Sequence, residues 1–132
     1  GEGYITIEGA DHILDKMRNL LSQVEKRVYI SCTRNYLLLL VRELEDLIRD
    51  KKKVVIITDQ PASFDNAKVY VGENRGMQIG LIADSRYVLT GEYGEGSLNT
   101  CLYSGQKNFV ELYKTALSNE IKLLSMREEN QQ

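Results

Sequence analysis

Apolar and polar residues alternate along several short segments of the chain, while other segments carry apolar residues at helical spacing. Residues 4–7 and 27–32 are rich in β-branched and aromatic side chains, which is typical of strands. Between them, residues 10–26 place apolar side chains three and four positions apart. This spacing predicts a helix with one buried face, so the chain is expected to begin strand, helix, strand.

A second helix is predicted from Tyr36 to Asp50, with Thr33 or Asn35 able to cap its start. Its apolar stripe continues to Ile48, but Leu38 and Leu39 lie off that stripe and make the helix apolar on more than one side. A helix of this kind is either unusually buried or part of a subunit interface.

The second half of the chain predicts further strands and one long helix. The apolar run 54–57 is typical of a central strand in a largely parallel sheet. Residues 67–71 and 98–103 predict short strands, and residues 76–92 predict a hairpin that turns at Asp84-Ser85. A helix is expected from residue 106 onward, with residues 126–132 frayed. The fold class is therefore α/β, a single domain over residues 1–132 whose mixed, mostly parallel sheet is flanked by helices.

Composition narrows the class of protein. The 132 residues are 42% hydrophobic and 27% charged with a net charge of −2, which argues against this chain gripping a nucleic acid backbone by itself. The longest apolar run, 37–41, is far shorter than the ~20 residues of a membrane span. With no signal peptide visible, we expect a cytoplasmic protein without a membrane partner, in which Cys32 and Cys101 are free thiols.

The sequence carries no recognisable catalytic motif, and we expect neither a cofactor nor a metal. His12, which we expect on the surface, is the only histidine, so no second histidine exists to activate Cys32 as a nucleophile. In open α/β sheets, however, ligands bind beyond the carboxyl ends of the strands. That rule gathers a polar set that suits a small polar ligand: Cys32, Thr33, Arg34, Asn35 and Asp59. If the last strand runs in the same direction, the set is joined by Ser104, Lys107 and Asn108. Helix capping and turn formation explain several of these residues equally well.

Three segments together resemble a known family: RVYISCTRNYLLLLVRELEDLI, KVVIITDQ and GMQIGLIADSRYVLTGE. They are similar to the phospholipase D-like fold, and in particular to the C-terminal effector-sensing domain of TrmB-type sugar-responsive transcriptional regulators. The resemblance implies a homodimer that binds a small-molecule effector, such as a sugar. It also implies that operator DNA is bound by an N-terminal winged helix, which would lie upstream of this sequence.

Phospholipase D-like enzymes carry a motif of His, one residue, Lys, four residues and Asp. On this sequence Met77 stands at the position of the nucleophilic His, Ile79 at that of the phosphate-binding Lys, and Asp84 at that of the Asp. Neither Met77 nor Ile79 can attack or hold a phosphate, so a non-catalytic sensing and dimerisation domain is expected. The helix from Tyr36 to Asp50 and the C-terminal helix are the candidate subunit interfaces. A phospholipase D-like phosphodiesterase or nuclease and a purely structural oligomerisation module remain the alternatives.

Overall fold

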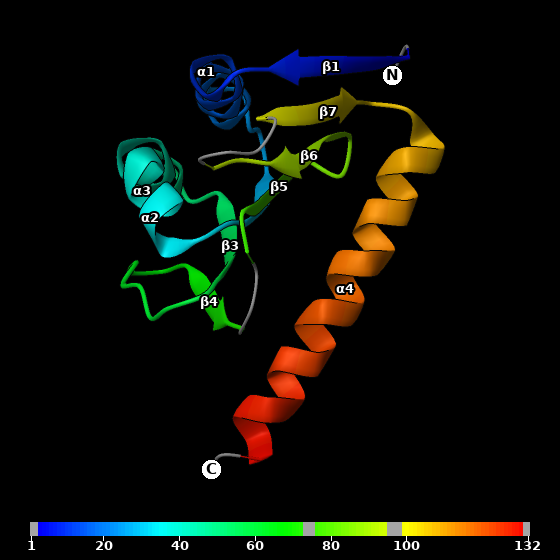
Figure 1. Ribbon diagram of the computed structural model, residues 1–132. Coiled ribbons are helices and arrows are strands. Elements are labelled where there is room, and N and C mark those ends of the chain that lie inside the picture. Colours follow the sequence, from blue (N-terminus) through cyan, green and yellow to red (C-terminus); the bar gives the residue numbers. More distant parts are fainter. Residues whose placement is uncertain (1–2, 73–75, 95–98, 131–132) are drawn as a thin grey trace.

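The computed structural model describes residues 3–72, 76–94 and 99–130, which form one α/β unit (Figure 1). The strands are β1 (Tyr4–Glu8), β2 (Arg27–Ser31), β3 (Lys53–Thr58), β4 (Lys68–Val71), β5 (Gln78–Ala83), β6 (Tyr87–Glu92) and β7 (Thr100–Ser104). The helices are α1 (Ala10–Ser22), α2 (Arg34–Leu37), the 3₁₀ turn η1 (Leu38–Leu40), α3 (Val41–Arg49) and α4 (Lys107–Asn130). The predicted order of strands and helices is confirmed.

The strands form one seven-stranded sheet in the order β1-β7-β6-β5-β2-β3-β4. β2, β3 and β4 are parallel neighbours, whereas the pairs β1–β7, β7–β6, β6–β5 and β5–β2 are antiparallel. The expected mostly parallel sheet is therefore wrong: the sheet is mixed and mostly antiparallel. The apolar run of β3 reports burial on both faces, and a strand gains such burial from helices above and below it whatever the direction of its neighbours.

Helices cover both faces of the sheet, so the core has two parts (Figure 1). α1, α2, η1 and α3 lie on one face, and α4 runs across the other. The first part is formed by α1, α3 and the strand residues that face them, among them Ile13, Met17, Leu21, Leu44, Ile30 and Leu81. The second part lies under α4 and contains Ile57, Ile82, Val88, Val110, Leu117 and Leu124. Burial of each such large side chain contributes about 1.5–3 kcal/mol.

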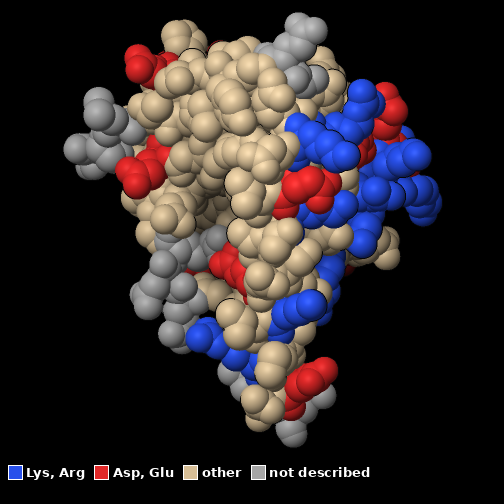
Figure 2. Space-filling view, turned by 90° about the vertical axis from the view of Figure 1, so that its right-hand side faces the viewer, with Lys and Arg blue, Asp and Glu red and all other residues tan. Residues whose placement is uncertain are grey.

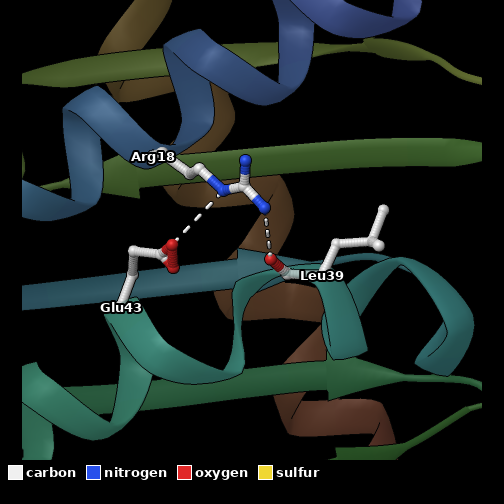
Figure 3. A network of polar contacts seen from close by, with 3 residues as sticks. All are labelled: Arg18, Leu39 and Glu43. Atoms are coloured by element: carbon white, nitrogen blue, oxygen red, sulfur yellow. Dashed lines mark hydrogen bonds and ion pairs between the residues drawn. The ribbon is translucent and has the colours of Figure 1, made fainter.

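The second helix is interrupted, which corrects the continuous helix expected from Tyr36 to Asp50. The backbone tightens into a 3₁₀ turn at η1, and this turn leaves Leu38 and Leu39 exposed. A guanidinium N–H of Arg18 on α1 donates to the Leu39 carbonyl at 3.1 Å, and Arg18 Nε lies 3.3 Å from Glu43 Oε1 (Figure 3). Arg18 therefore satisfies a carbonyl at the interruption and ties α1 to α3.

The predicted hairpin is confirmed as β5 and β6. Asp84 and Ser85 both have φ of 55°, and the Arg86 N–H donates to the Ala83 carbonyl at 2.9 Å. Two successive positive φ angles match the right-handed twist of the strands that the turn joins. Asp is among the non-glycine residues that adopt this conformation most readily.

The C-terminal helix continues to Asn130, so the expectation that residues 126–132 fray is wrong for the described part, up to residue 130. Leu124 packs against Gly72 after β4, and Lys68 Nζ lies 3.4 Å from Glu128 Oε2. These contacts hold the end of α4 to the edge of the sheet. Within residues 3–72, 76–94 and 99–130, no helix is long and apolar enough to cross a membrane.

Candidate functional site

The catalytic positions of the phospholipase D-like motif are occupied by apolar side chains. Ile79 is 3% exposed and belongs to the core on the α1 and α3 side of the sheet. Met77 lies just before β5 and covers Gly94, where an added Cβ would stand 2.6 Å from the Met77 methyl carbon. The Tyr93 N–H donates to the Met77 carbonyl at 2.8 Å. The place of the reactive pair is therefore taken by a buried aliphatic side chain at Ile79 and by an apolar thioether at Met77 that is 48% exposed.

The same end of the core holds a tyrosine and two cysteines, all buried. Tyr36 is 2% exposed, its ring contacts that of Tyr93 edge-on at 4.6 Å, and its hydroxyl has no hydrogen-bond partner among the described residues. Burial raises the pKa of Tyr36, nearby Cys101, Cys32 and Tyr93 raise it further, and Arg18 opposes them. Burial also raises the pKa of Cys101 to about 11.

Neither cysteine is placed to act as a nucleophile. Neither cysteine forms a disulfide, as predicted, but Cys32 is 0% and Cys101 1% exposed, so a substrate cannot reach either sulfur in this conformation. Cys101 is also protonated at neutral pH, and the thiolate is the reactive form. A nuclease that used Cys32 as its nucleophile therefore has no support in this arrangement.

Asp84, the one matching residue of the motif, binds backbone. Its Oδ2 accepts the Glu25 N–H at 2.9 Å, and its Oδ1 accepts those of Lys26 at 2.8 Å and Arg27 at 3.0 Å. Partial burial raises the pKa of Asp84, but these three hydrogen bonds and the Arg27 charge lower it by more, so the pKa lies below its ordinary value. Asp84 therefore joins the hairpin turn to the start of β2, a structural reason for an Asp here.

The polar residues that follow β2 and β3 do meet at one edge of the sheet. Thr33 Oγ1 accepts the Tyr36 N–H at 3.2 Å as the cap of α2. Asp59 Oδ1 accepts the Arg34 N–H at 2.9 Å, while Arg34 and Asn35 are exposed. Because Thr33 and Asp59 already serve backbone groups, the capping interpretation accounts for both residues. Binding of a ligand by Cys32, Thr33, Arg34, Asn35 and Asp59 stays a prediction.

Ser104, Lys107 and Asn108 lie at the opposite edge of the sheet, so the structure does not bring them to the same site. Ser104 pairs with Tyr4 and Val88, where β1 and β6 begin. Its buried hydroxyl donates to the Gly3 carbonyl at 2.7 Å and accepts the Gln106 N–H at 2.9 Å. The prediction that Ser104, Lys107 and Asn108 join the ligand site required β7 to run parallel to β2 and β3. β7 runs in the opposite direction.

A groove of about 610 Å³ between the sheet and α4 is the feature that sequence reasoning missed. Its wall carries five cations: Arg27, Lys53 and Lys68 at the first positions of β2, β3 and β4, and Lys114 and Lys122 on α4. Tyr29 and Tyr70 line it as well. Figure 2, which views the α4 side, shows Lys and Arg gathered along one flank of this face. We call this feature the basic groove.

A repeated pattern in the sequence marks the basic groove in retrospect. A cation opens each of three strands, and a tyrosine or valine stands two residues later on the same face: Arg27 with Tyr29, Lys53 with Val55, Lys68 with Tyr70. These pairs become neighbours only because β2, β3 and β4 are adjacent and parallel. The signal could have been found, but only together with the strand order.

No protein-family model matches the sequence, and no curated protein matches it significantly. Solved structures do share its fold. TrmBL2, an archaeal chromatin protein with a novel mode of DNA binding, is similar at a TM-score of 0.75 and 12% identity, over 92% of this chain and 53% of that chain. NucT from Helicobacter pylori is similar at a TM-score of 0.68 and 15% identity, over 91% and 96% of the two chains.

Nuc from Salmonella typhimurium, a phospholipase D family member, is similar at a TM-score of 0.63 and 8% identity, over 89% of this chain and 92% of that chain. At such identities the likeness concerns the fold alone. This chain spans about half the length of TrmBL2, 53%, and nearly all of the two smaller proteins. The chain therefore has the phospholipase D-like α/β fold.

Proposed function

We propose that the chain is a non-catalytic ligand-sensing and dimerisation domain of a TrmB-type transcriptional regulator. The observation that carries the proposal is the burial of Ile79, at 3% exposure, where phospholipase D-like enzymes hold phosphate with a lysine. The likeness to TrmBL2, which binds DNA and of which this chain spans 53%, supports a role as one part of a DNA-binding protein. Operator DNA is then bound by a winged helix outside this sequence.

A second copy of this chain is the proposed partner of α4. The helix buries Val110, Leu117 and Leu124 against the sheet, yet it carries a second stripe on its outer side. This outer stripe consists of Leu112, Ala116, Asn119, Leu123 and Met126, all exposed. Their spacing alternates between four and three residues, which is the spacing of helices that pair side by side.

The outer stripe is also self-complementary. Leu112 and Met126 stand seven residues before and after Asn119, and Ala116 and Leu123 stand three before and four after it. An antiparallel crossing centred on Asn119 therefore sets Leu112 against Met126 and Ala116 against Leu123 of the second copy, large against small. The two Asn119 amides then meet on the two-fold axis, where they can hydrogen-bond to each other.

Light scattering of Leu123→Glu tests the dimer. The new carboxylate would be buried without a partner at the crossing, so the dissociation constant should rise at least about a hundredfold. Leu38→Glu is the matched control, because Leu38 is equally apolar, is 57% exposed, and lies on the other candidate interface. If Leu38→Glu is monomeric while Leu123→Glu remains a dimer, the interface lies at η1 and not at α4. If the unmodified chain is strictly monomeric at high concentration, dimerisation is refuted.

Sensing predicts that a small metabolite, such as a sugar or a sugar phosphate, raises the melting temperature and changes the dimer equilibrium. A broad metabolite library that leaves both unchanged would favour a purely structural oligomerisation module. The absence of catalysis predicts no hydrolysis of an activated phosphodiester above the buffer rate. Turnover that disappears on Cys32→Ser would contradict the proposal and restore the nuclease alternative.

A further inference from the structure

We infer that the basic groove binds a nucleotide unit: an aromatic base joined through a sugar to phosphate. The groove lies where β2, β3 and β4 begin, at the opposite edge of the sheet from the lost catalytic positions. Its volume of about 610 Å³ is within the usual range of small-molecule sites, roughly 300–1,000 Å³. The inference rests on the proposed function only where it takes the bound ligand to be the effector.

The arrangement of charge in the groove calls for an anion. Arg27 and Lys53 are direct partners in the parallel β2–β3 pair, and like charges in that position repel each other. The 13 residues that line the groove include five cations and no carboxylate. Among the described residues, only Lys68 of the five has a carboxylate within ion-pair distance, that of Glu128. A multiply charged phosphate group in the groove would relieve this repulsion.

The tyrosines add the second half of the recognition. Lys53 Nζ lies 5.4 Å from the ring centre of Tyr29, and Lys68 Nζ lies 4.7 Å from that of Tyr70. Both rings are half-buried, and each ammonium group lies over its ring. A base that stacks on one of these rings takes the place of the ammonium group, which is then free to reach the phosphate of the same ligand. A neutral sugar can pack its C–H groups against a ring, but it carries no charge to offset the five cations of the groove. The chemistry of the groove therefore favours a phosphorylated, base-bearing ligand over a free sugar.

The groove and the outer stripe share one helix. Lys114, Ser118 and Lys122 line the groove, while Asn119 and Leu123 face outward from the same two turns of α4. A ligand that draws Lys114 and Lys122 toward β2 and β3 would act on the backbone that also presents the proposed dimer surface. This link supplies the physical route by which an effector would bias the dimer.

Titration calorimetry of the 132-residue chain with four probes tests the site. The probes are adenosine, inorganic triphosphate, adenosine triphosphate and a ten-residue single-stranded DNA. Adenosine triphosphate should bind at least about tenfold more tightly than adenosine or triphosphate alone, since only it combines both contacts. Tighter binding by the single strand, with a salt slope of about −0.7 per contacted phosphate, would identify nucleic acid as the source of the nucleotide unit.

Variants locate the binding. Lys114→Gln with Lys122→Gln should weaken adenosine triphosphate at least about tenfold, whereas Arg42→Gln, on the opposite face, should change it less than about twofold. Glu128→Gln should strengthen it several-fold because Lys68 is released. Tyr70→Leu should weaken adenosine triphosphate but not inorganic triphosphate. Circular dichroism confirms that each variant is folded.

The outcomes separate this inference from the proposed function. Failure of all four probes to bind, or equal losses from Arg42→Gln and from the groove variants, would overturn the site. Binding with the expected variant pattern but without any change in the dimer equilibrium would uphold the site and refute sensing. If a neutral metabolite changes the dimer equilibrium and the groove variants bind that metabolite as tightly as the unmodified chain, sensing is upheld. The effector then binds outside the basic groove.

Discussion

Replacing Asp84 by asparagine or glycine separates the charge of its carboxylate from the backbone conformation that it adopts. Both replacements tolerate the φ of 55° at this position, whereas alanine would add strain of its own. Asparagine keeps one oxygen for the Lys26 and Arg27 N–H groups, but its NH₂ would face the Glu25 N–H, donor against donor. Glycine removes all three hydrogen bonds.

The magnitudes follow from these bonds. A hydrogen bond to a charged group contributes about 1.5–3 kcal/mol, and the partial exposure of Asp84 reduces this to about 1 kcal/mol for each. Asp84→Asn should therefore lower the free energy of unfolding by about 1–2 kcal/mol, and Asp84→Gly by about 3 kcal/mol. Urea unfolding followed by circular dichroism at pH 7 measures both. Asp15→Asn on exposed α1 surface is the matched control and should cost less than about 0.5 kcal/mol.

The pH dependence provides the refutation. The pKa of Asp84 lies below its ordinary value in the folded chain, so its stabilisation is complete above the unfolded pKa of about 4 and is lost as the pH falls through the folded pKa. The stability difference between wild type and Asp84→Asn should therefore narrow below about pH 4. Equal stability at pH 7, or a difference that persists unchanged at pH 2, would show that the carboxylate charge does not hold the turn.

Three further predictions concern packing, reactivity and capping. Gly91→Ala should lower the free energy of unfolding by about 3 kcal/mol, because the added Cβ would stand 2.7 Å from the Cα of Cys101. Gly80→Ala should lower it by only about 1 kcal/mol, because the added Cβ meets the side chain of Tyr113, which can move. Equal losses in urea unfolding would contradict this difference. Cys101, with a pKa of about 11, should resist alkylation at pH 8 until the chain unfolds, as mass spectrometry can follow. Thr33→Ala should lower stability by about 1 kcal/mol and Thr33→Ser should restore it, since a hydroxyl cap is all that is required.

Local features of the fold could be predicted because their causes lie within a few residues. The spacing of Ile13, Met17 and Leu21 predicts the buried face of α1, and the Asp84-Ser85 pair predicts the turn between β5 and β6. The interruption at η1 could not be predicted in this way. Its free carbonyl at Leu39 is satisfied by Arg18, which is 21 residues earlier in the chain and on another helix.

The candidate site was harder to predict, because it depends on strand order. The rule for α/β sheets directed attention to the carboxyl ends of the strands, where Thr33 and Asp59 bind backbone groups. The basic groove lies at the other ends. Its cations are 26 and 15 residues apart at Arg27, Lys53 and Lys68, and only the parallel registers of β2, β3 and β4 make them neighbours. Net charge is a sum over the whole surface, so a total of −2 concealed a local concentration of positive charge.

The position of β1 has a consequence for the order in which the sheet forms. β1 lies at an edge and pairs only with β7, about a hundred residues later in the chain, while β5, β6 and β7 are consecutive antiparallel neighbours. Closing so long a loop costs more entropy than joining neighbours, and the exposed β1 returns little buried surface for it. β1 should therefore join the sheet last and leave it first. The amide hydrogens of β1 should then exchange with solvent through local opening, whereas those of the central strand β2 should exchange only when the whole domain unfolds.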